Sequence, residues 1–254
     1  MEHIDYVKFG GSDSRDYCAL IASRSIYTIP QRRQRFITIP KKSGSVYIDD
    51  GAYNNIGVEY VLKLFPAVSD ISAPHEDLTN LVNRFRKSFA LKEGKGGYYK
   101  LTDSYDPDVF RWAAVERTTV EVGTGEVATV TVTFNCKPYR YYWSGENTYM
   151  ITSPKQIKSV GLEGARPLIT IYGSAGTCGV RIKKGTLWDK TYTLTLDAPS
   201  VDIDSENGTV MYLRTNKSKQ YTSAEFPVFP AGTFTVSPTG NTTTIIFKPR
   251  WYDI

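Results

Sequence analysis

The chain has 254 residues, of which 41% are hydrophobic and 22% are charged, a composition typical of a globular protein and not of a disordered one. It contains 18 tyrosines, 11 phenylalanines and 4 tryptophans but only 2 histidines and 3 cysteines, which favours a β-rich structural or binding protein over an enzyme. The net charge is +5, no apolar stretch approaches the roughly 20 residues that cross a bilayer, and the polar start predicts no signal peptide.

The first basic segment lies near the start of the chain. Between residues 17 and 48 there are six basic residues and no acid, namely Arg24, Arg32, Arg33, Arg35, Lys41 and Lys42. The arginines lead into Phe36-Ile37-Thr38-Ile39, which predicts a strand. No nucleic-acid-binding motif accompanies these charges, so we expect a solvated face or a protein–protein surface and no specific nucleic acid recognition.

Charge is distributed unevenly along the chain. Residues 81–101 carry a second basic excess, with six basic residues against Glu93. The two basic segments are balanced by an acidic excess in the rest of the chain, while the whole chain remains at +5. This asymmetry indicates that the two halves of the chain meet different partners.

Period-two patterns predict strands in the first half. Residues 58–65 alternate, with Val58, Tyr60, Leu62 and Leu64 on one face. Residues 109–122 and 126–134 read as two strands joined by a hairpin turn at residues 123–125. In the second of them, Val130, Val132 and Phe134 share a face opposite a row of threonines.

One helix is predicted around residues 78–89, with its first turn near Pro74 and its end before the glycines at 94–97. Its apolar residues follow the spacing i, i+3, i+4, i+7, i+11 and are Leu78, Leu81, Val82, Phe85 and Phe89. Pro74, Glu76 and Asp77 suit the first turn, and the glycines at 94, 96 and 97 suit the end. We expect the apolar stripe to cover a sheet.

The composition of the sequence changes after Pro138, where an aromatic run is followed by polar residues and then by short predicted strands. This change predicts two domains, residues 1–138 and residues 139–254. Short strands with turns between them follow at residues 168–172, 180–183, 192–196, 201–204, 210–214, 233–236 and 243–247, a spacing that predicts a β-sandwich or barrel. The glycine-rich residues 173–179 read as a flexible hairpin turn. Whether the last ten residues pack back on the first domain stays open.

No catalytic, metal or cofactor site is predicted. His3 and His75 lie in no catalytic motif, and Cys18, Cys136 and Cys178 are too far apart for a disulfide framework or a metal site, so we expect three reduced thiols. Residues 202–208 superficially resemble a calcium loop, but Asn207 stands where glycine is required and Leu213 where a bidentate acid is required. We expect Val201 and Ile203 to point inward instead.

Several segments, in order, resemble the distal tail protein (Dit) of siphophages, in the siphovirus tail-component family. They include residues 7–14, residues 37–44, residues 132–139, residues 166–174 with the sequence Arg-Pro-Leu-Ile-Thr-Ile-Tyr-Gly-Ser, residues 201–206, residues 226–232, and the terminal residues 248–252 with the sequence Lys-Pro-Arg-Trp-Tyr. Each motif is short, and their order and spacing over the whole length carry the likeness. The basic turn departs from the family in having Lys41-Lys42-Ser43 where a further glycine and an Arg-Asp pair are common.

The resemblance implies a mainly β protein with a minor α component. The N-terminal domain would be a β-sandwich-like ring domain with one helix and a β-hairpin belt, and the C-terminal domain a galectin-like, carbohydrate-module-like β-sandwich. It implies a homohexameric ring at the virion tail tip, assembled in the host cytoplasm, without membrane insertion or cofactor. The partners would be the tail tube protein, the tail-associated (Tal) protein and, at the C-terminal domain, receptor-binding or baseplate proteins.

Two sets of residues are candidates for these contacts. The basic residues Arg32, Arg33, Arg35, Lys41 and Lys42 are the interface candidates. The aromatic residues Tyr141, Tyr142, Trp143 and Trp188 are candidate stacking platforms under the alternative function, a carbohydrate-binding receptor-recognition module. A glycosidase or peptidase is a third hypothesis, and no residue pattern in the sequence supports it.

Overall fold

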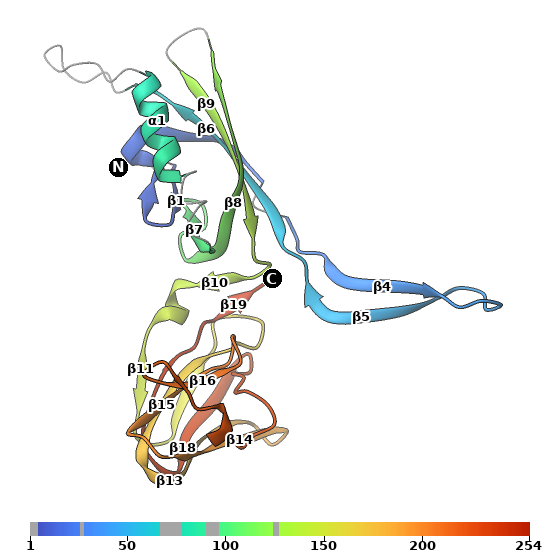
Figure 1. The fold of residues 1–254 in the computed structure, drawn as a ribbon, viewed down its shortest axis with the longest axis vertical. Helices are drawn as coiled ribbons and strands as arrows, with labels where there is room; N and C mark the ends of the chain where they lie inside the picture. The colour runs from blue at the N-terminus through green and yellow to red at the C-terminus, as the bar shows by residue number, and fades with distance from the viewer. Residues whose placement is uncertain (1–4, 26–27, 67–77, 90–96, 124–126) are drawn as a thin grey trace, which may run out of the picture. The chain divides into compact units, whose positions relative to one another are not determined.

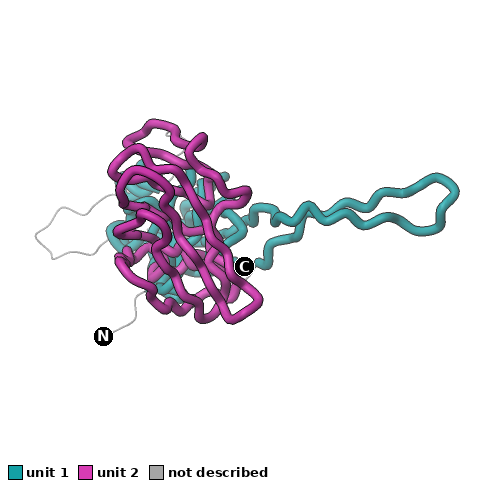
Figure 2. The backbone as a smooth tube through the Cα atoms, turned by 90° about the horizontal axis from the view of Figure 1, so that it is seen from below, with its two compact units in different colours: residues 1–140, 254 teal, residues 141–253 magenta. Residues whose placement is uncertain are grey.

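A computed structural model of the chain describes residues 5–25, 28–66, 78–89, 97–123 and 127–254. The chain divides into two compact units, unit 1 with Met1–Arg140 and Ile254, and unit 2 with Tyr141–Asp253 (Figure 2). The predicted first turn of the helix at Pro74, Glu76 and Asp77, the glycines at 94 and 96, and most of the predicted turn at 123–125 lie outside the described residues. No helix among the described residues is long and apolar enough to cross a membrane.

Unit 1 is an antiparallel sheet with a helix on it. The sheet runs in the order β2-β1-β7-β8-β9-β6-β3 (Figure 1). Its strands are β1 Val7–Phe9, β2 Ser12–Asp13, β3 Ala19–Arg24, β6 Ile56–Leu64, β7 Tyr99–Asp103, β8 Val109–Val122 and β9 Ala128–Cys136, with the short 3-10 helix η1 Ser14–Tyr17. The separate strands β4 Arg32–Thr38 and β5 Ser45–Tyr53 form a two-stranded sheet of their own.

The helix α1 spans Leu78–Phe89, the segment in which the apolar stripe predicts a helix. Leu81, Val82, Phe85 and Phe89 are buried, because the apolar stripe lies on the sheet and shares one core with it. The ring of Tyr17, from η1, meets Phe85 and Phe89 edge-on. The predicted inward faces of β6 and β9 are confirmed, since every second residue of each strand is buried in this core.

Unit 2 is a β-sandwich, which confirms the predicted fold class. Its sheet consists of β11 Tyr149–Ile151, β12 Lys155–Lys158, β13 Leu168–Lys184, β14 Trp188–Leu196, β15 Ser200–Asp204, β16 Thr209–Tyr212, β17 Thr215–Asn216 and β18 Thr233–Lys248, with the 3-10 helices η3 Trp143–Glu146 and η4 Ser218–Gln220. The short strands β10 Arg140–Tyr142, which starts at the last residue of unit 1, and β19 Tyr252–Asp253 pair with each other. One core unites residues from both layers, including Ile169, Leu194, Phe234 and Trp251.

Two strands pass from one layer of the sandwich to the other. The first part of β13 pairs with β15, its second part pairs with β14, and β18 follows it along both parts. The register shifts where the strands cross, between Tyr172 and Cys178. Bulges of this kind let a strand bend around the corner of a sandwich.

The prediction of a hairpin turn at residues 173–179, with separate strands on either side, is therefore wrong. Residues 168–172 and 180–183 belong to the one strand β13, and residues 233–236 and 243–247 belong to β18. The glycines serve close approach of backbones instead of a turn: a Cβ on Gly179 would collide with the carbonyl oxygen of Tyr192, and one on Gly240 with that of Thr177.

Candidate assembly surface

The β4–β5 hairpin is the most exposed part of unit 1. Every residue of β4 is exposed, and β5 has no buried residue. Figure 1 draws the two strands as a ribbon that is not part of the larger sheet. The exposed fractions of four apolar side chains are 64% for Phe36, 46% for Ile37, 37% for Val46 and 51% for Tyr47. These partly exposed apolar side chains make the hairpin a candidate interaction surface.

The register assigns these side chains to opposite faces. Phe36 lies opposite Tyr47, and Ile37 lies opposite Val46, and residues directly opposite each other in an antiparallel pair share a face. The rings of Phe36 and Tyr47 are 5.6 Å apart between centroids. The hairpin therefore has an aromatic face, with Phe36 and Tyr47, and an aliphatic face, with Ile37 and Val46.

Each face also carries one ion pair. Arg32 Nε lies 2.6 Å from a carboxylate oxygen of Asp49, and Arg35 lies 3.1 Å from Asp50. The charge of Asp49 raises the pKa of Arg32 above its ordinary value. Both pairs are exposed and contribute little stability, but they leave the two arginines compensated within the hairpin.

The tip of the hairpin is a tight basic turn. The amide of Lys42 donates to the carbonyl of Ile39 at 3.1 Å, and Pro40 supplies the fixed φ that the second position of such a turn prefers. Lys41 takes a φ of 65°, a left-handed conformation that a lysine seldom adopts. The turn thereby presents two adjacent lysines at the end of the hairpin, which we also call the arm.

The root of the hairpin is held by polar and aromatic contacts. The side-chain amide of Asn55 donates to Tyr98 Oη and to Asn135 Oδ1, each at 2.7 Å. The ring of Tyr53 meets that of Tyr139 edge-on at 6.3 Å. These contacts tie the end of β5 to the sheet of unit 1, so the direction in which the arm leaves the sheet is defined by side chains.

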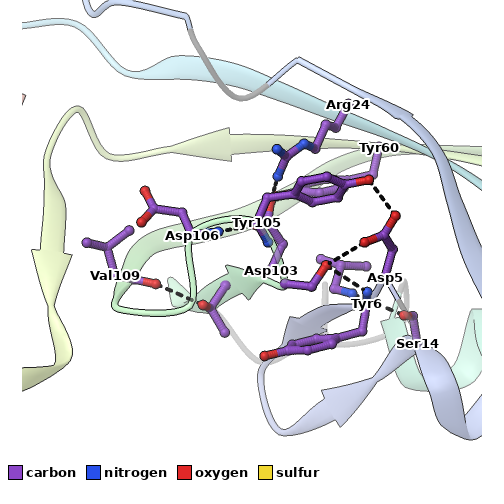
Figure 3. A network of polar contacts seen from close by, with 12 residues as sticks. Asp5, Tyr6, Ser14, Arg24, Tyr60, Asp103, Tyr105, Asp106 and Val109 are labelled. Atoms are coloured by element: carbon purple, nitrogen blue, oxygen red, sulfur yellow. Dashed lines mark hydrogen bonds and ion pairs between the residues drawn. The ribbon is translucent and has the colours of Figure 1, made fainter. Parts of the chain in front are cut away.

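A buried ion pair fixes the other strand that leads to the hairpin (Figure 3). Arg24, the last residue of β3, lies 2.9 Å from Asp103, whose side chain is 4% exposed. Asp103 also accepts hydrogen bonds from Tyr60 Oη at 2.8 Å and from the backbone amides of Tyr105 and Asp106 at 2.9 and 3.1 Å. The guanidinium of Arg24 stacks over the ring of Tyr105.

The effect of this network on titration follows from burial. Burial, together with the charge of Asp103, raises the pKa of Tyr60 well above its ordinary value, so this hydroxyl stays a donor. The hydroxyl of Tyr105 donates to Asp5, and this hydrogen bond raises the pKa of Tyr105. Four donors thus meet the Asp103 carboxylate, as a buried charge requires.

All five predicted basic residues lie on the hairpin. Arg32, Arg33 and Arg35 are in β4, and Lys41 and Lys42 are in the turn. The sequence interpretation treated this segment as uniformly basic, but Asp49 and Asp50 follow it directly and face Arg32 and Arg35 across the hairpin. The cations with no acidic partner in the described part of this hairpin are Arg33, Lys41 and Lys42.

The charge asymmetry does not follow the two units. Unit 2 has 12 lysines and arginines against 9 acids, and unit 1 has 19 against 17. The basic and acidic segments therefore alternate within unit 1.

The sequence analysis did not predict that apolar side chains on both faces of the hairpin are exposed. The run Phe36-Ile37-Thr38-Ile39, which lies between basic residues, was the signal in the sequence that could have indicated it.

The four predicted aromatic residues lie in different surroundings within unit 2. Tyr141 is 4% exposed and donates to Glu206 at 3.0 Å. Tyr142 packs against the core and donates to Asp253. Trp143 is 38% exposed, in η3. Trp188 lines an apolar hollow, and a lysine, Lys190, lies over its ring at 4.9 Å. Only the last two rings have an accessible environment.

The residues screened for chemistry have structural surroundings. No group of three or more His, Cys, Asp or Glu side chains that could hold a metal occurs in the described part of the chain. Asp204 caps its own turn and is paired with Arg250 at 2.7 Å, while Val201 and Ile203 point into the core as predicted. The three cysteines are free, and burial raises the pKa of the Cys136 thiol to about 12.

Comparison with known proteins shows the fold. No family model matches the chain, and no curated protein matches its sequence. Among solved structures, the chain is similar to the SPP1 Dit (gp 19.1) protein, described as a paradigm of the hub adsorption apparatus in phages that infect Gram-positive bacteria, at 17% identity and a TM-score of 0.69, over 96% of this chain and 98% of that one.

The second similarity is to the baseplate of phage P2. The structure of that baseplate in its activated conformation with Ca aligns at 13% identity and a TM-score of 0.55, and the structure with Sr at 13% and 0.53, each over 96% of this chain and 97% of the other. The chain is thus a mainly β protein with the architecture of phage tail hub proteins. Specifically, the chain has the fold of a Dit protein over 96% of its length, as the sequence resemblance implied.

Proposed function

We propose that the chain is a structural hub of a phage tail tip, which forms a hexameric ring between the tail tube on one side and the baseplate or tail-associated protein on the other. It would be a virion component assembled in the host cytoplasm, and a non-enzymatic one. The support is the likeness to SPP1 Dit along the whole chain, which includes both units.

The observation that carries the proposal within the chain itself is the exposed hairpin. Phe36, Tyr47, Ile37 and Val46 are partly left in water by the single chain, and burying their remaining exposed surface favours association, each by less than the about 1.5–3 kcal/mol gained when a fully exposed side chain of this kind is buried. An arm of this kind, repeated identically on each copy, suits a head-to-tail contact that closes into a ring. The basic candidates lie on the same arm, so the predicted contact residues and the apolar ones form one surface.

The test is the mass of the chain in solution, combined with negative-stain images. We expect six copies of the 28.5 kDa chain in a ring with a central channel, formed by the chain alone or on addition of the tail tube protein of the same phage. The double variant Phe36→Ser with Tyr47→Ser should lose the ring. Leu187→Ser, at a residue of unit 2 that is 100% exposed, is the matched control and should keep it. A monomer under both conditions contradicts the proposal.

A second candidate function has one specific observation behind it. The hollow beside Trp188 is lined mainly by apolar groups, from the β13–β14 turn and from Val228, Pro230 and Ala231. An indole at the wall of a hollow can stack on a sugar ring, which is the carbohydrate-binding alternative. A glycan array tests it: binding that disappears in Trp188→Ala and persists in Trp143→Ala supports this hollow, and an array without binding removes it.

A further inference from the structure

An arginine stands on the core side of the sheet in unit 1. Arg111 of β8 lies directly opposite Leu101 of β7, and residues directly opposite each other in an antiparallel pair share a face. Leu101 is 3% exposed and belongs to the core of unit 1, as does Ala113, two residues further along β8. The side chain of Arg111 therefore points to the side of the sheet where the strands carry mostly apolar residues. A charged group at such a position requires a partner.

Within the described part of the chain, most of the Arg111 guanidinium has no partner. One of its nitrogens donates to the carbonyl oxygen of Pro138 at 3.1 Å, whereas a guanidinium has several more N–H donors. No carboxylate among the described residues lies within ion-pair distance of Arg111. Burial lowers the pKa of Arg111, and the positive charge of Arg140 lowers it further. An arginine nevertheless keeps its charge near neutral pH, so the protein holds this cation with little compensation.

A small cavity lies beside this guanidinium. Its volume of about 40 Å³ holds roughly two or three water-sized groups. Arg111 and Arg140 both line it, and its other walls include Tyr60, Asp103 and Asp106, which Figure 3 shows from close by. All of the lining residues belong to unit 1. The cavity is thus a recess beside the core with two guanidinium groups in its walls.

The charges around the cavity leave one positive charge in excess. Asp103 is paired with Arg24 at 2.9 Å. Asp106 is paired with Arg140 at 3.1 Å. Both carboxylates are thereby compensated, and Arg111 is the remaining cation. One monovalent anion would neutralise the group, whereas a divalent anion would bring a second negative charge towards the two carboxylates and is disfavoured.

We infer that this cavity binds one small monovalent anion of about the size of chloride, held between the guanidinium groups of Arg111 and Arg140. The hydrogen bond from Arg140 to Asp106 uses Nη1, so the other N–H groups of Arg140 remain for the anion. Hydrogen bonds between a cation and an anion are roughly twice as strong as neutral ones. The anion would offset the repulsion between the two arginines and so fix residues 138–140, where Arg111 already holds the Pro138 carbonyl. This site does not depend on the proposed hub function.

The measurement is the unfolding of unit 1 in urea, followed by hydrogen-exchange mass spectrometry on peptides of β7 and β8 from the full chain. Potassium chloride replaces potassium gluconate in steps at constant ionic strength, so general screening stays the same, and gluconate is too large for the cavity. A ligand that binds only the folded state lowers the equilibrium constant of unfolding in proportion to its concentration once that exceeds Kd. We expect a fall of at least about tenfold at about 0.2 M chloride, which corresponds to a Kd of about 20 mM or lower. Peptides of β13 and β18 in unit 2 should not respond.

Three variants separate this site from a general effect of the salt. Arg111→Met removes the excess charge and keeps much of the side-chain volume, so its unfolding should be the same in chloride and in gluconate. Asp106→Asn removes a carboxylate that repels the anion, so it should reach the response of the parent at about threefold less chloride or lower. Arg117→Met, at an exposed position of the same strand, is the matched control and should respond as the parent does.

Each outcome supports or overturns the anion site. A chloride response that is present in the parent and in Arg117→Met and is lost in Arg111→Met supports it. No response in the parent means that the cavity holds water only and overturns it. A response that persists in Arg111→Met, or that weakens in Asp106→Asn, assigns the anion to another place and overturns it as well.

Discussion

Removal of the Asp103 carboxylate tests how the base of the hairpin is held. The variant Asp103→Ala removes the carboxylate that lies 2.9 Å from the guanidinium of Arg24, at a site where the Arg24 side chain is 12% exposed. It also removes the acceptor of Tyr60 Oη and of two backbone amides. Breaking a buried ion pair from one side costs about 3–5 kcal/mol, so we expect unit 1 to lose stability of that size.

The geometry also predicts an order among variants. Arg24→Met leaves the Asp103 carboxylate with the Tyr60 hydroxyl and two amides as donors, so it should cost less than Asp103→Ala. Tyr60→Phe removes one hydrogen bond to a charged group and should cost about 1.5–3 kcal/mol. For a unit of this size a loss of 3–5 kcal/mol lowers Tm by roughly 10–20 °C.

The assay is urea unfolding followed by hydrogen-exchange mass spectrometry, which reads peptides of each unit separately. Peptides of β3 and β7 should lose protection in Asp103→Ala, while those of β13 and β18, in unit 2, should not. Arg181→Ala is the matched control, since it breaks an ion pair with Asp189 at an exposed site, where pairs contribute about 0–1 kcal/mol. Equal losses in Asp103→Ala and Arg181→Ala would refute the reasoning that burial makes the Asp103 pair important.

Three further outcomes are expected from unit 2 and from the thiols. Gly179→Ala should destabilise unit 2 by about 3 kcal/mol or more in urea unfolding, because the added Cβ would collide with the backbone. Gly57→Ala is the control: nothing lies near its added Cβ, so its free energy of unfolding should stay within about 1 kcal/mol of that of the parent. Similar losses in both variants would refute the argument from close backbone approach. Burial raises the pKa of Asp204, but the hydrogen bonds and charge of Arg250, together with hydrogen bonds from Asn207, outweigh it and lower the pKa overall. The stability that this pair contributes is therefore present above the ordinary carboxyl pKa of about 3.9 and is lost as pH falls through the lower folded value. Arg250→Met should lose stability at pH 7 and show less further loss on acidification from pH 5 to 2 than the parent, and an unchanged pH profile counts against it. Finally, a thiol reagent at pH 8 should titrate one group per native chain, at Cys18, and three in urea; three in the native chain would contradict the burial of the other two.

Local patterns determined the helix and several strands of unit 1. The stripe from Leu78 to Phe89 is a helix because its apolar residues recur every 3.6 residues, and that period has one structural interpretation. The alternation in β6 and β9 likewise predicts which side chains are buried, since a strand has a period of two. The order of short motifs along the chain also predicted the Dit-like fold, and the solved structures agree.

The strands of unit 2 show where local patterns are insufficient. A glycine-rich segment has the same composition whether it is a turn or a bulge, and residues 173–179 belong to a bulge in β13 only because β18 follows that strand around the corner of the sandwich. The decision depends on a partner strand about 65 residues away in sequence.

The candidate assembly surface was half determined by sequence. The five basic residues Arg32, Arg33, Arg35, Lys41 and Lys42 stand out by type and lie on one hairpin. Cross-strand pairing in the folded hairpin decided which of these residues form ion pairs, because it brings Asp49 and Asp50 beside Arg32 and Arg35. That the apolar residues between them face water on both sides was decided by the tertiary structure alone, because a strand looks the same in sequence whether or not a core forms against it.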